Sequence, residues 1–222
     1  MKISITSSRS PWSGHSWFTK AFLWTYDWFA LGFCCQFVWQ CPSSYILKFY
    51  NEHISANHLD IGVGTGFFLD KCRFHVQLPS LVLLDLNPNM LEKAQKRLNR
   101  YHPQVYQMNI MESHPLSIPA FDSIGLSYIL HCLPGTMATK EAVFQNIVPL
   151  LKPGGTVFGT TFLYKGVKRS PLATCAFWFT NLFRFMENKE DSLDALEQSL
   201  KKYFSEVYIE QRGCAVLFWA RR

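Results

Sequence analysis

The feature that most constrains this chain is a run of three glycines at alternate positions directly after an apolar strand, within HLDIGVGTGFF at residues 58–68. Glycine adopts positive φ values readily and has no Cβ, so a ligand can touch the backbone of such a loop. A helix that begins just after the loop offers unpaired N–H groups in its first turn. The pattern therefore predicts an α/β unit whose strand-to-helix turn binds a ligand.

The spacing of the glycines excludes two common nucleotide-binding loops. A dinucleotide fingerprint, G-x-G-x-x-G, requires its third glycine at position 67 or 69, where the chain has Phe67 and Leu69. A phosphate-binding loop requires G-x-x-x-x-G-K-[ST], which the residues after Gly62 do not supply. The residues match D-x-G-x-G-x-G instead, beginning at Asp60.

Three further motifs follow the glycine loop in order: VLLD at 82–85, FDSIGLSYILH at 121–131 and LLKPGGTVF at 150–158. Together with the loop they resemble the class I S-adenosylmethionine-dependent methyltransferases, over residues 55–163. The resemblance implies a doubly wound, mainly parallel seven-stranded α/β sheet with a terminal antiparallel hairpin and an N-terminal helical lid. It also implies an enzyme that uses S-adenosylmethionine as its cofactor and transfers a methyl group by in-line displacement.

Hydrophobic periodicity predicts the same alternation of strands and helices. We expect strands at 59–61, 81–84, 105–108, 121–127 and 156–162, helices at 43–51, 67–72, 89–100, 140–150 and 192–203, and a hairpin at 207–220. A chain of 222 residues suits one α/β domain with a sizeable core. With the resemblance, the order predicts a helical lid over residues 1–54 and a cofactor-binding core over 55–222, with a substrate-side insertion at 164–186.

The resemblance assigns the methionine and ribose ends of the cofactor to the first two strands. Gly62, Gly64 and Gly66 would let the methionine part lie against the loop, and Asp60 would orient its amino group. Asp85, at the end of the second strand, would accept hydrogen bonds from both ribose hydroxyls, because a carboxylate only accepts. The alternative for either aspartate is a role as a helix cap.

The remaining cofactor contacts are expected after the third and fourth strands and in the lid. Asn109 would face the adenine amino group, with Ile110 and Leu86 against the ring, although Asn is also common in turns. Ser127 lies where the backbone of the fourth strand would approach the methionine moiety. Tyr26 would reach the cofactor carboxylate or, alternatively, pack in the core.

A general base is optional for this reaction, because the cofactor supplies the activated methyl group and the protein mainly aligns donor and acceptor. If the acceptor is a hydroxyl, its proton must be taken by a nearby group. His131, at the end of the fourth strand, is the first candidate and Tyr128 is the second. A single histidine is more often satisfied by local structure, so this alternative stays open.

The acceptor must be recognised by the parts outside the core, residues 15–41 and 164–186, which are rich in aromatic side chains and have no dense basic cluster. This composition favours an apolar or aromatic small molecule in an enclosed pocket. The net charge of +6 is spread along the chain, and the end of the fourth strand lacks the N-P-P-Y type signature of amino-methylating nucleic-acid enzymes. We expect no nucleic-acid partner, and the oligomeric state stays open.

The apolar residues 21–39 are long enough to span a bilayer, but Asp27 and Gln36 lie inside them and an aspartate is costly in lipid. The seven cysteines form no C-x-x-C pair, which favours free thiols in a reducing compartment over disulfides or a zinc site. The sequence therefore predicts a cytoplasmic enzyme without a metal ion. The alternatives are a cofactor-binding protein that lacks methyl transfer or catalyses another reaction, and a membrane-associated interaction protein.

Overall fold

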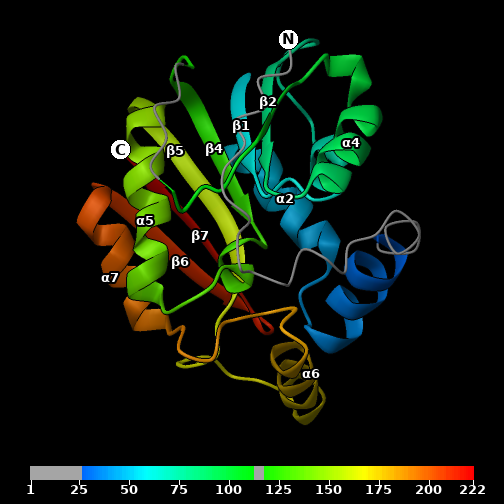
Figure 1. Cartoon of the computed structure of the whole chain (residues 1–222), viewed down its shortest axis with the longest axis vertical. Helices are drawn as coiled ribbons and strands as arrows, with labels where there is room; N and C mark the ends of the chain where they lie inside the picture. Colours follow the sequence, from blue (N-terminus) through cyan, green and yellow to red (C-terminus); the bar gives the residue numbers. More distant parts are fainter. Residues whose placement is uncertain (1–26, 113–117) are drawn as a thin grey trace.

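A single seven-stranded sheet organises the computed structural model, which describes residues 27–112 and 118–222 (Figure 1). The strand order is β3-β2-β1-β4-β5-β7-β6; β1 to β5 pair in parallel, and β7 is antiparallel to both β5 and β6. The expected doubly wound, mainly parallel seven-stranded sheet is confirmed, including the antiparallel hairpin at the edge. The strands are β1 (Asn57–Ile61), β2 (Ser80–Asp85), β3 (Gln104–Gln107), β4 (Phe121–Ser127), β5 (Leu151–Phe162), β6 (Glu206–Arg212) and β7 (Ala215–Arg221).

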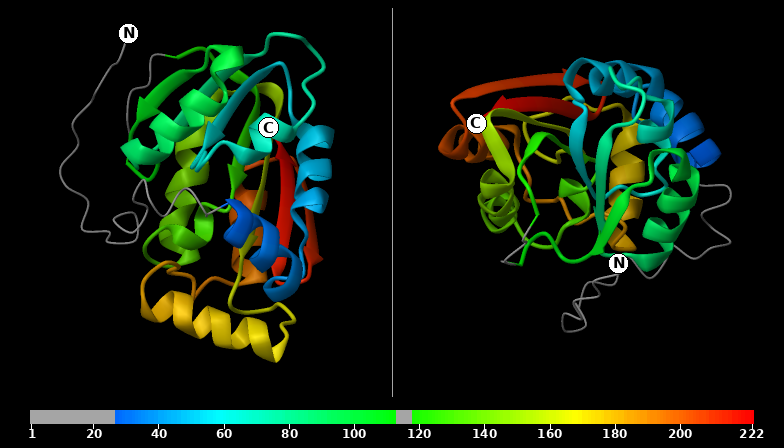
Figure 2. Two further views of the ribbon diagram at one scale, coloured as in Figure 1. Left: turned by 90° about the vertical axis from the view of Figure 1, so that its right-hand side faces the viewer. Right: turned by 90° about the horizontal axis from the view of Figure 1, so that it is seen from above.

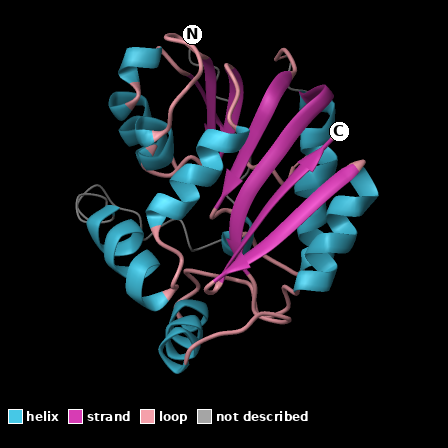
Figure 3. Ribbon diagram, turned by 180° about the vertical axis from the view of Figure 1, so that it is seen from behind, coloured by secondary structure: helices cyan, strands magenta, loops and turns pink. Residues whose placement is uncertain are grey.

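Helices cover both faces of the sheet (Figure 3). Those on one face are α5 (Met137–Ile147) and α7 (Leu193–Tyr203); the other face carries α2 (Ser43–His53), α3 (Phe67–Lys71) and α4 (Pro88–Arg97). Two further helices, η2 (Asp27–Val38) and α6 (Pro171–Leu182), extend the second face beyond the sheet. Short 3-10 turns are η3 (Asn99–Tyr101), η4 (Leu130–Cys132) and η5 (Val148–Leu150).

The core lies in two layers because successive side chains of a strand point to opposite faces. In β7, Val216 and Phe218 pack toward α5 and α7, whereas Ala215 and Leu217 pack on the opposite side with α2 and η2. All four are fully buried. Strands β2 and β7 therefore contain continuous apolar runs, LVLL at 81–84 and AVLFWA at 215–220, as expected for strands covered on both faces.

Local sequence signals explain where two of the helices begin and end. The Asn87 side chain accepts a hydrogen bond from the N–H of Asn89 at 2.9 Å, and Pro88 occupies the first turn, so α4 begins as predicted. This helix ends at Arg97, earlier than expected, and the 3-10 turn η3 follows it. Helix α5 begins at Met137 rather than Lys140 and ends before Pro149, which cannot continue a helix.

The aromatic segment before the sheet forms η2, a π-helix. Its winding shows in the hydrogen bond from the Trp39 N–H to the carbonyl of Cys34, five residues earlier. Leu31 and Cys35 are buried, whereas Trp28, Phe29, Phe33 and Phe37 of the same helix are exposed. No helix in the described ranges is long and apolar enough to cross a membrane.

Candidate active site

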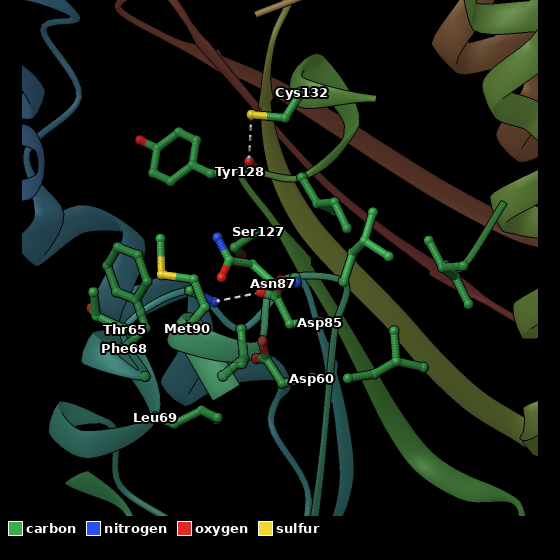
Figure 4. A pocket seen from close by; sticks show the side chains of 18 of the residues that line it. Asp60, Thr65, Phe68, Leu69, Asp85, Asn87, Met90, Ser127, Tyr128 and Cys132 are labelled. Carbon is green, nitrogen blue, oxygen red and sulfur yellow. Dashed lines mark hydrogen bonds between the residues drawn. The ribbon is translucent and has the colours of Figure 1, made fainter. Parts of the chain in front are cut away.

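A cleft lies at the carboxyl ends of β1, β2 and β4. From β1 the sheet continues through β2 to β3 in one direction and through β4 to β5 in the other, so the strand order changes direction here. This is the place where doubly wound sheets bind their ligands. The cleft contains about 1200 Å³ of space free of protein atoms, part of it open to solvent. Figure 4 shows Asp60 and Asp85 close together at one end, with Tyr128 and Cys132 toward the other.

The three glycines of the loop all have positive φ values, of 69°, 56° and 73°, but each is required for a different reason. A Cβ on Gly62 would lie 2.6 Å from the Ile129 side chain, and one on Gly66 would lie 3.2 Å from Ala94 of α4. A Cβ on Gly64 would meet no protein atom closer than 4.0 Å. Gly64 is therefore the position at which the backbone is open toward a ligand.

Asp60 is buried at the end of β1 and hydrogen-bonded on one carboxylate oxygen. The Tyr50 hydroxyl donates to Oδ2 at 3.0 Å, and Nε2 of His58 lies 3.4 Å from the same atom. Burial and the charge of Asp60 raise the pKa of Tyr50 well above its usual value, so the phenol stays protonated and keeps donating. Gly125 makes room for this carboxylate, since a Cβ there would lie 2.7 Å from Oδ2.

Asp85 joins the end of β2 to the glycine loop. Its carboxylate accepts hydrogen bonds from the N–H groups of Gly64 at 3.2 Å and Asn87 at 2.9 Å. Burial raises the pKa of Asp85 to about 6, although these backbone hydrogen bonds oppose the shift. The carboxyl group is therefore mostly ionised at neutral pH, but its pKa lies only about one unit below that pH.

The charges of the cleft discriminate between classes of ligand. Its described lining includes the carboxylates of Asp60 and Asp85 and no lysine, arginine or histidine. A dinucleotide would bring a pyrophosphate next to two acids with no lining cation to neutralise it. A sulfonium with an amino group brings positive charge instead, so the cleft fits S-adenosylmethionine better than NAD.

The expected adenine end of the cleft is apolar except for Asn109. Leu86, Met90 and Ile110 line it, and the last two are buried. The Asn109 amide is held within its own turn, because Oδ1 accepts from the N–H of Met111 at 3.1 Å and Nδ2 donates to Glu112 at 2.9 Å. The structure therefore shows its role in the turn, and its contact with adenine stays a prediction.

Tyr128 shapes the opposite end of the cleft, immediately after Ser127, which also lines it. Its φ of 60° is rare for a bulky residue. The N–H of Tyr128 donates to the carbonyl of Thr160 at 2.6 Å, and its ring stacks on Phe162 with centroids 4.9 Å apart. The hydroxyl lies 3.7 Å from Sγ of Cys35, so η2 packs against Tyr128.

Comparison with known proteins agrees with this geometry. A family model for a methyltransferase domain matches residues 59–157. The chain is 37% identical to demethylluteothin O-methyltransferase of Streptomyces thioluteus, over 93% of this chain and 90% of that protein. The chain belongs to the class I S-adenosylmethionine-dependent methyltransferases. This methyltransferase therefore binds S-adenosylmethionine and transfers its methyl group.

One further relative and one solved structure extend the comparison. The physcion biosynthesis cluster O-methyltransferase of Aspergillus chevalieri is 33% identical, over 89% of each chain. The crystal structure of the N-methyltransferase NodS from Bradyrhizobium japonicum WM9, in complex with S-adenosylhomocysteine, matches with a TM-score of 0.55 and 20% identity. That match covers 79% of this chain and 82% of NodS, and it shows a shared fold.

His131 of this methyltransferase does not line the cleft, although Tyr128 does. It is buried in η4, where Nδ1 accepts a hydrogen bond from the N–H of Phe162 at 3.3 Å. Burial, and secondarily the charge of Lys140, lower the pKa of His131 to about 3. The imidazole is neutral and already engaged, so the structure gives no support to its role as a base and favours the local alternative.

Lys140 is itself fully buried and ties the methyltransferase core to the segment before α7. Its ammonium donates to the Asp191 carboxylate at 2.6 Å and to the carbonyl of Glu187 at 2.7 Å. Burial lowers the pKa of Lys140, and the charge of Asp191 opposes that shift. The pair fixes the chain that follows α6, at the same end of the molecule as the cleft.

A polar cluster that the sequence did not predict joins η2 to the glycine loop. Asp27 accepts a hydrogen bond from the Thr65 hydroxyl at 2.6 Å and pairs with the Arg97 guanidinium on α4. Arg97 also donates to the carbonyl and hydroxyl oxygens of Thr65, at 3.0 and 3.1 Å. We call Asp27, Thr65 and Arg97 the latch. Tyr26, the expected contact to the cofactor carboxylate, lies outside the described residues.

Proposed function

We propose that this methyltransferase methylates a hydroxyl group on an apolar or aromatic small molecule. The observation that carries the proposal is the change in character along one cleft. The end with Asp60 and Asp85 is acidic, whereas Leu31, Tyr128 and Leu133 supply apolar and aromatic surface to the same space. The two curated relatives are named as O-methyltransferases, which supports oxygen as the methylated atom.

Residues at the ends of three strands are proposed to bind different parts of S-adenosylmethionine. When bound, its sulfonium supplies an activated methyl group. Gly64 offers an open backbone to the methionine part, Asp60 offers negative charge to the amino group, and Asp85 offers acceptors to the ribose hydroxyls. Asn109 and Ile110 are proposed for the adenine end.

Tyr128 is the residue proposed to face the acceptor. Its ring is fixed between Phe162 and the Cys35 side of η2, so its hydroxyl can hydrogen-bond an acceptor hydroxyl and hold it in line with the methyl group. Alignment of this kind can lower the barrier by several kcal/mol without a strong base. The burial of His131 agrees with a mechanism that depends on positioning.

We further propose that η2 is part of a lid over residues 1–54, above a core of residues 55–222 with a substrate-side insertion at 164–186. Support comes from Leu31, which lines the cleft from η2, and from the latch that fastens this helix to the glycine loop. The cytoplasm is the proposed location, supported by the free thiols of all seven cysteines.

The proposal is tested with purified full-length protein and S-adenosylmethionine carrying a labelled methyl group. We expect label to enter phenolic or enolic small molecules, and not matched amines or thiols, and titration calorimetry to detect S-adenosylmethionine but not NADH. Tyr128→Phe should lower kcat with little change in cofactor affinity. Cofactor binding without transfer to any hydroxyl acceptor would favour the alternative of a binding protein, and transfer to an amine would contradict the assignment of oxygen.

A further inference from the structure

Two helices expose large apolar side chains that neither the core nor the cleft uses. Among the described residues, Trp28 is 75% exposed and Trp178 is 59% exposed, and seven others are between 44% and 59% exposed. We call these nine side chains the aromatic face. Its members are Trp28, Phe29, Phe33 and Phe37 on η2 and Leu172, Trp178, Phe179, Leu182 and Phe183 on or beside α6.

The exposed side chains lie along one side of each helix and are not scattered. On η2 the ring centroids of Phe29 and Phe33 are 6.2 Å apart, and those of Phe33 and Phe37 are 5.1 Å apart. Phe179 and Phe183 lie 4.6 Å apart at the end of α6. Large contiguous apolar patches are rare on monomeric soluble proteins and usually mark a contact with a partner or a membrane.

The two helices belong to the same end of the molecule. They are in contact, and Trp39, at the end of η2, packs edge-on against Phe177 of α6 with centroids 5.3 Å apart. Figure 2 shows η2 in blue near α6 in gold, beyond the end of the sheet. The smaller buried side of each helix faces the protein through Leu31 and Ala173, which leaves the aromatic side outward.

The charges around the aromatic face are mostly positive. Helix α6 contains no charged residue, and the single charge of η2, Asp27, is paired with Arg97 in the latch. The chain from 164 to 190, which contains α6, has five basic residues and only two acidic ones, Glu187 and Glu190. The basic residues are Lys165, Lys168, Arg169, Arg184 and Lys189. Lys165 pairs with Glu190 and Arg184 pairs with Glu187, so the positive excess is carried by Lys168, Arg169 and Lys189.

We propose that the aromatic face docks on the surface of an anionic phospholipid bilayer, with η2 and α6 lying in the interface. Tryptophan and phenylalanine partition into the boundary between headgroups and acyl chains, and basic residues at the margin are attracted by anionic headgroups. A second copy of the chain is a poorer occupant, because a two-fold contact would bring the basic margins toward one another. This contact is superficial.

The test is flotation of full-length protein with vesicles of phosphatidylcholine alone or with about 30% phosphatidylglycerol. We expect binding to the anionic vesicles that weakens as salt is added, and a loss of at least about tenfold in partitioning when Trp28, Trp178 and Phe179 are changed to Ser. The matched control changes Val76 and Leu78, which are 42% and 63% exposed and lie outside the aromatic face, to Ser and should bind as the wild type does.

The proposal is overturned if the wild type does not float with anionic vesicles, or if the triple variant floats equally well. It is also overturned if light scattering detects a dimer that the triple variant lacks, because a second copy then covers the face. Cofactor titration separates a failure of membrane docking from a failure of the proposed function. The substituted side chains are exposed and none lines the cleft. The variant should bind S-adenosylmethionine as the wild type does, and failure of methyl transfer in both proteins would bear only on the proposed function.

Discussion

Lowering the pH should weaken cofactor binding through Asp85. Burial raises the pKa of Asp85 to about 6, and only its ionised form accepts hydrogen bonds with both oxygens. A bound ribose diol therefore favours the ionised form and lowers the pKa of the carboxyl. The affinity for the cofactor is therefore greatest well above pH 6 and falls as the pH drops through 6.

The size of the effect follows from the same pKa. Nearly all molecules carry the Asp85 carboxylate at pH 7.5, and roughly a tenth carry it at pH 5. If the protonated form does not bind, affinity should fall about tenfold between these values, which corresponds to about 1.4 kcal/mol. At pH 5, binding should also release nearly one proton per cofactor, whereas at pH 7.5 it should release almost none.

Titration calorimetry with S-adenosylhomocysteine, in buffers of different ionisation enthalpy, measures both quantities. Asp85→Asn is the matched variant and should bind at least about tenfold more weakly at pH 7.5, because hydrogen bonds to a charged group contribute roughly 1.5–3 kcal/mol. Its affinity should lack the pH dependence that Asp85 contributes to the wild type. A wild-type affinity that stays flat from pH 7.5 to 5, or a variant with the same pH dependence, would refute the role given to Asp85.

Asp85→Asn should weaken cofactor binding but stabilise the folded protein. A carboxyl whose pKa rises on folding, here from 3.8 to about 6, lowers the stability of the folded state once the pH exceeds both values. Asp85→Asn should therefore raise the free energy of unfolding of the cofactor-free enzyme at pH 7.5. The gain is at most about 3 kcal/mol, less the hydrogen bond lost to the glycine loop. Urea denaturation at pH 7.5 measures it.

Three other substitutions test separate parts of the structure. Gly64→Val should abolish cofactor binding in calorimetry while far-UV circular dichroism keeps its helical signal, because the new side chain points into open space and blocks the backbone; normal binding would place the ligand elsewhere. Asp27→Asn should lower the rate of methyl transfer several-fold by loosening the lid, whereas Glu92→Gln, which breaks an exposed ion pair on α4, should not; equal rates in both variants would contradict the latch. Lys140→Met should cost about 3–5 kcal/mol in urea denaturation because it leaves the buried Asp191 without its partner, and a neutral effect would count against that pair.

The place of the glycine loop and of Asp85 at the cleft could be predicted from the sequence because their signals are local. A strand of alternating side chains ends, the chain turns, and the next helix begins within about ten residues, so spacing alone aligns the motif. The structure shows in addition why each glycine is needed. Gly62 is required by the neighbouring Ile129 and Gly66 by α4, so only Gly64 is left open toward a ligand.

The latch could not be predicted, because it joins residues far apart in the chain. Asp27 and Arg97 meet only when η2 folds over α4, and no pattern in either segment indicates the other. His131 shows the same limit at short range. It follows the correct strand, but the 3-10 turn η4 directs it toward Phe162, and this change of direction depends on tertiary packing.

The backbone of Tyr128 has a consequence for how the acceptor range of such an enzyme can change. Its φ of 60° excludes β-branched residues, so Val, Ile or Thr at this position would shift the end of β4 and the cofactor side with it. Asn or Gly adopts the same backbone with little cost and removes the phenol ring. If Tyr128 faces the acceptor as proposed, a single replacement of this kind would enlarge the acceptor end for a bulkier substrate while the donor end keeps its geometry, but it would also remove the hydroxyl that positions the acceptor.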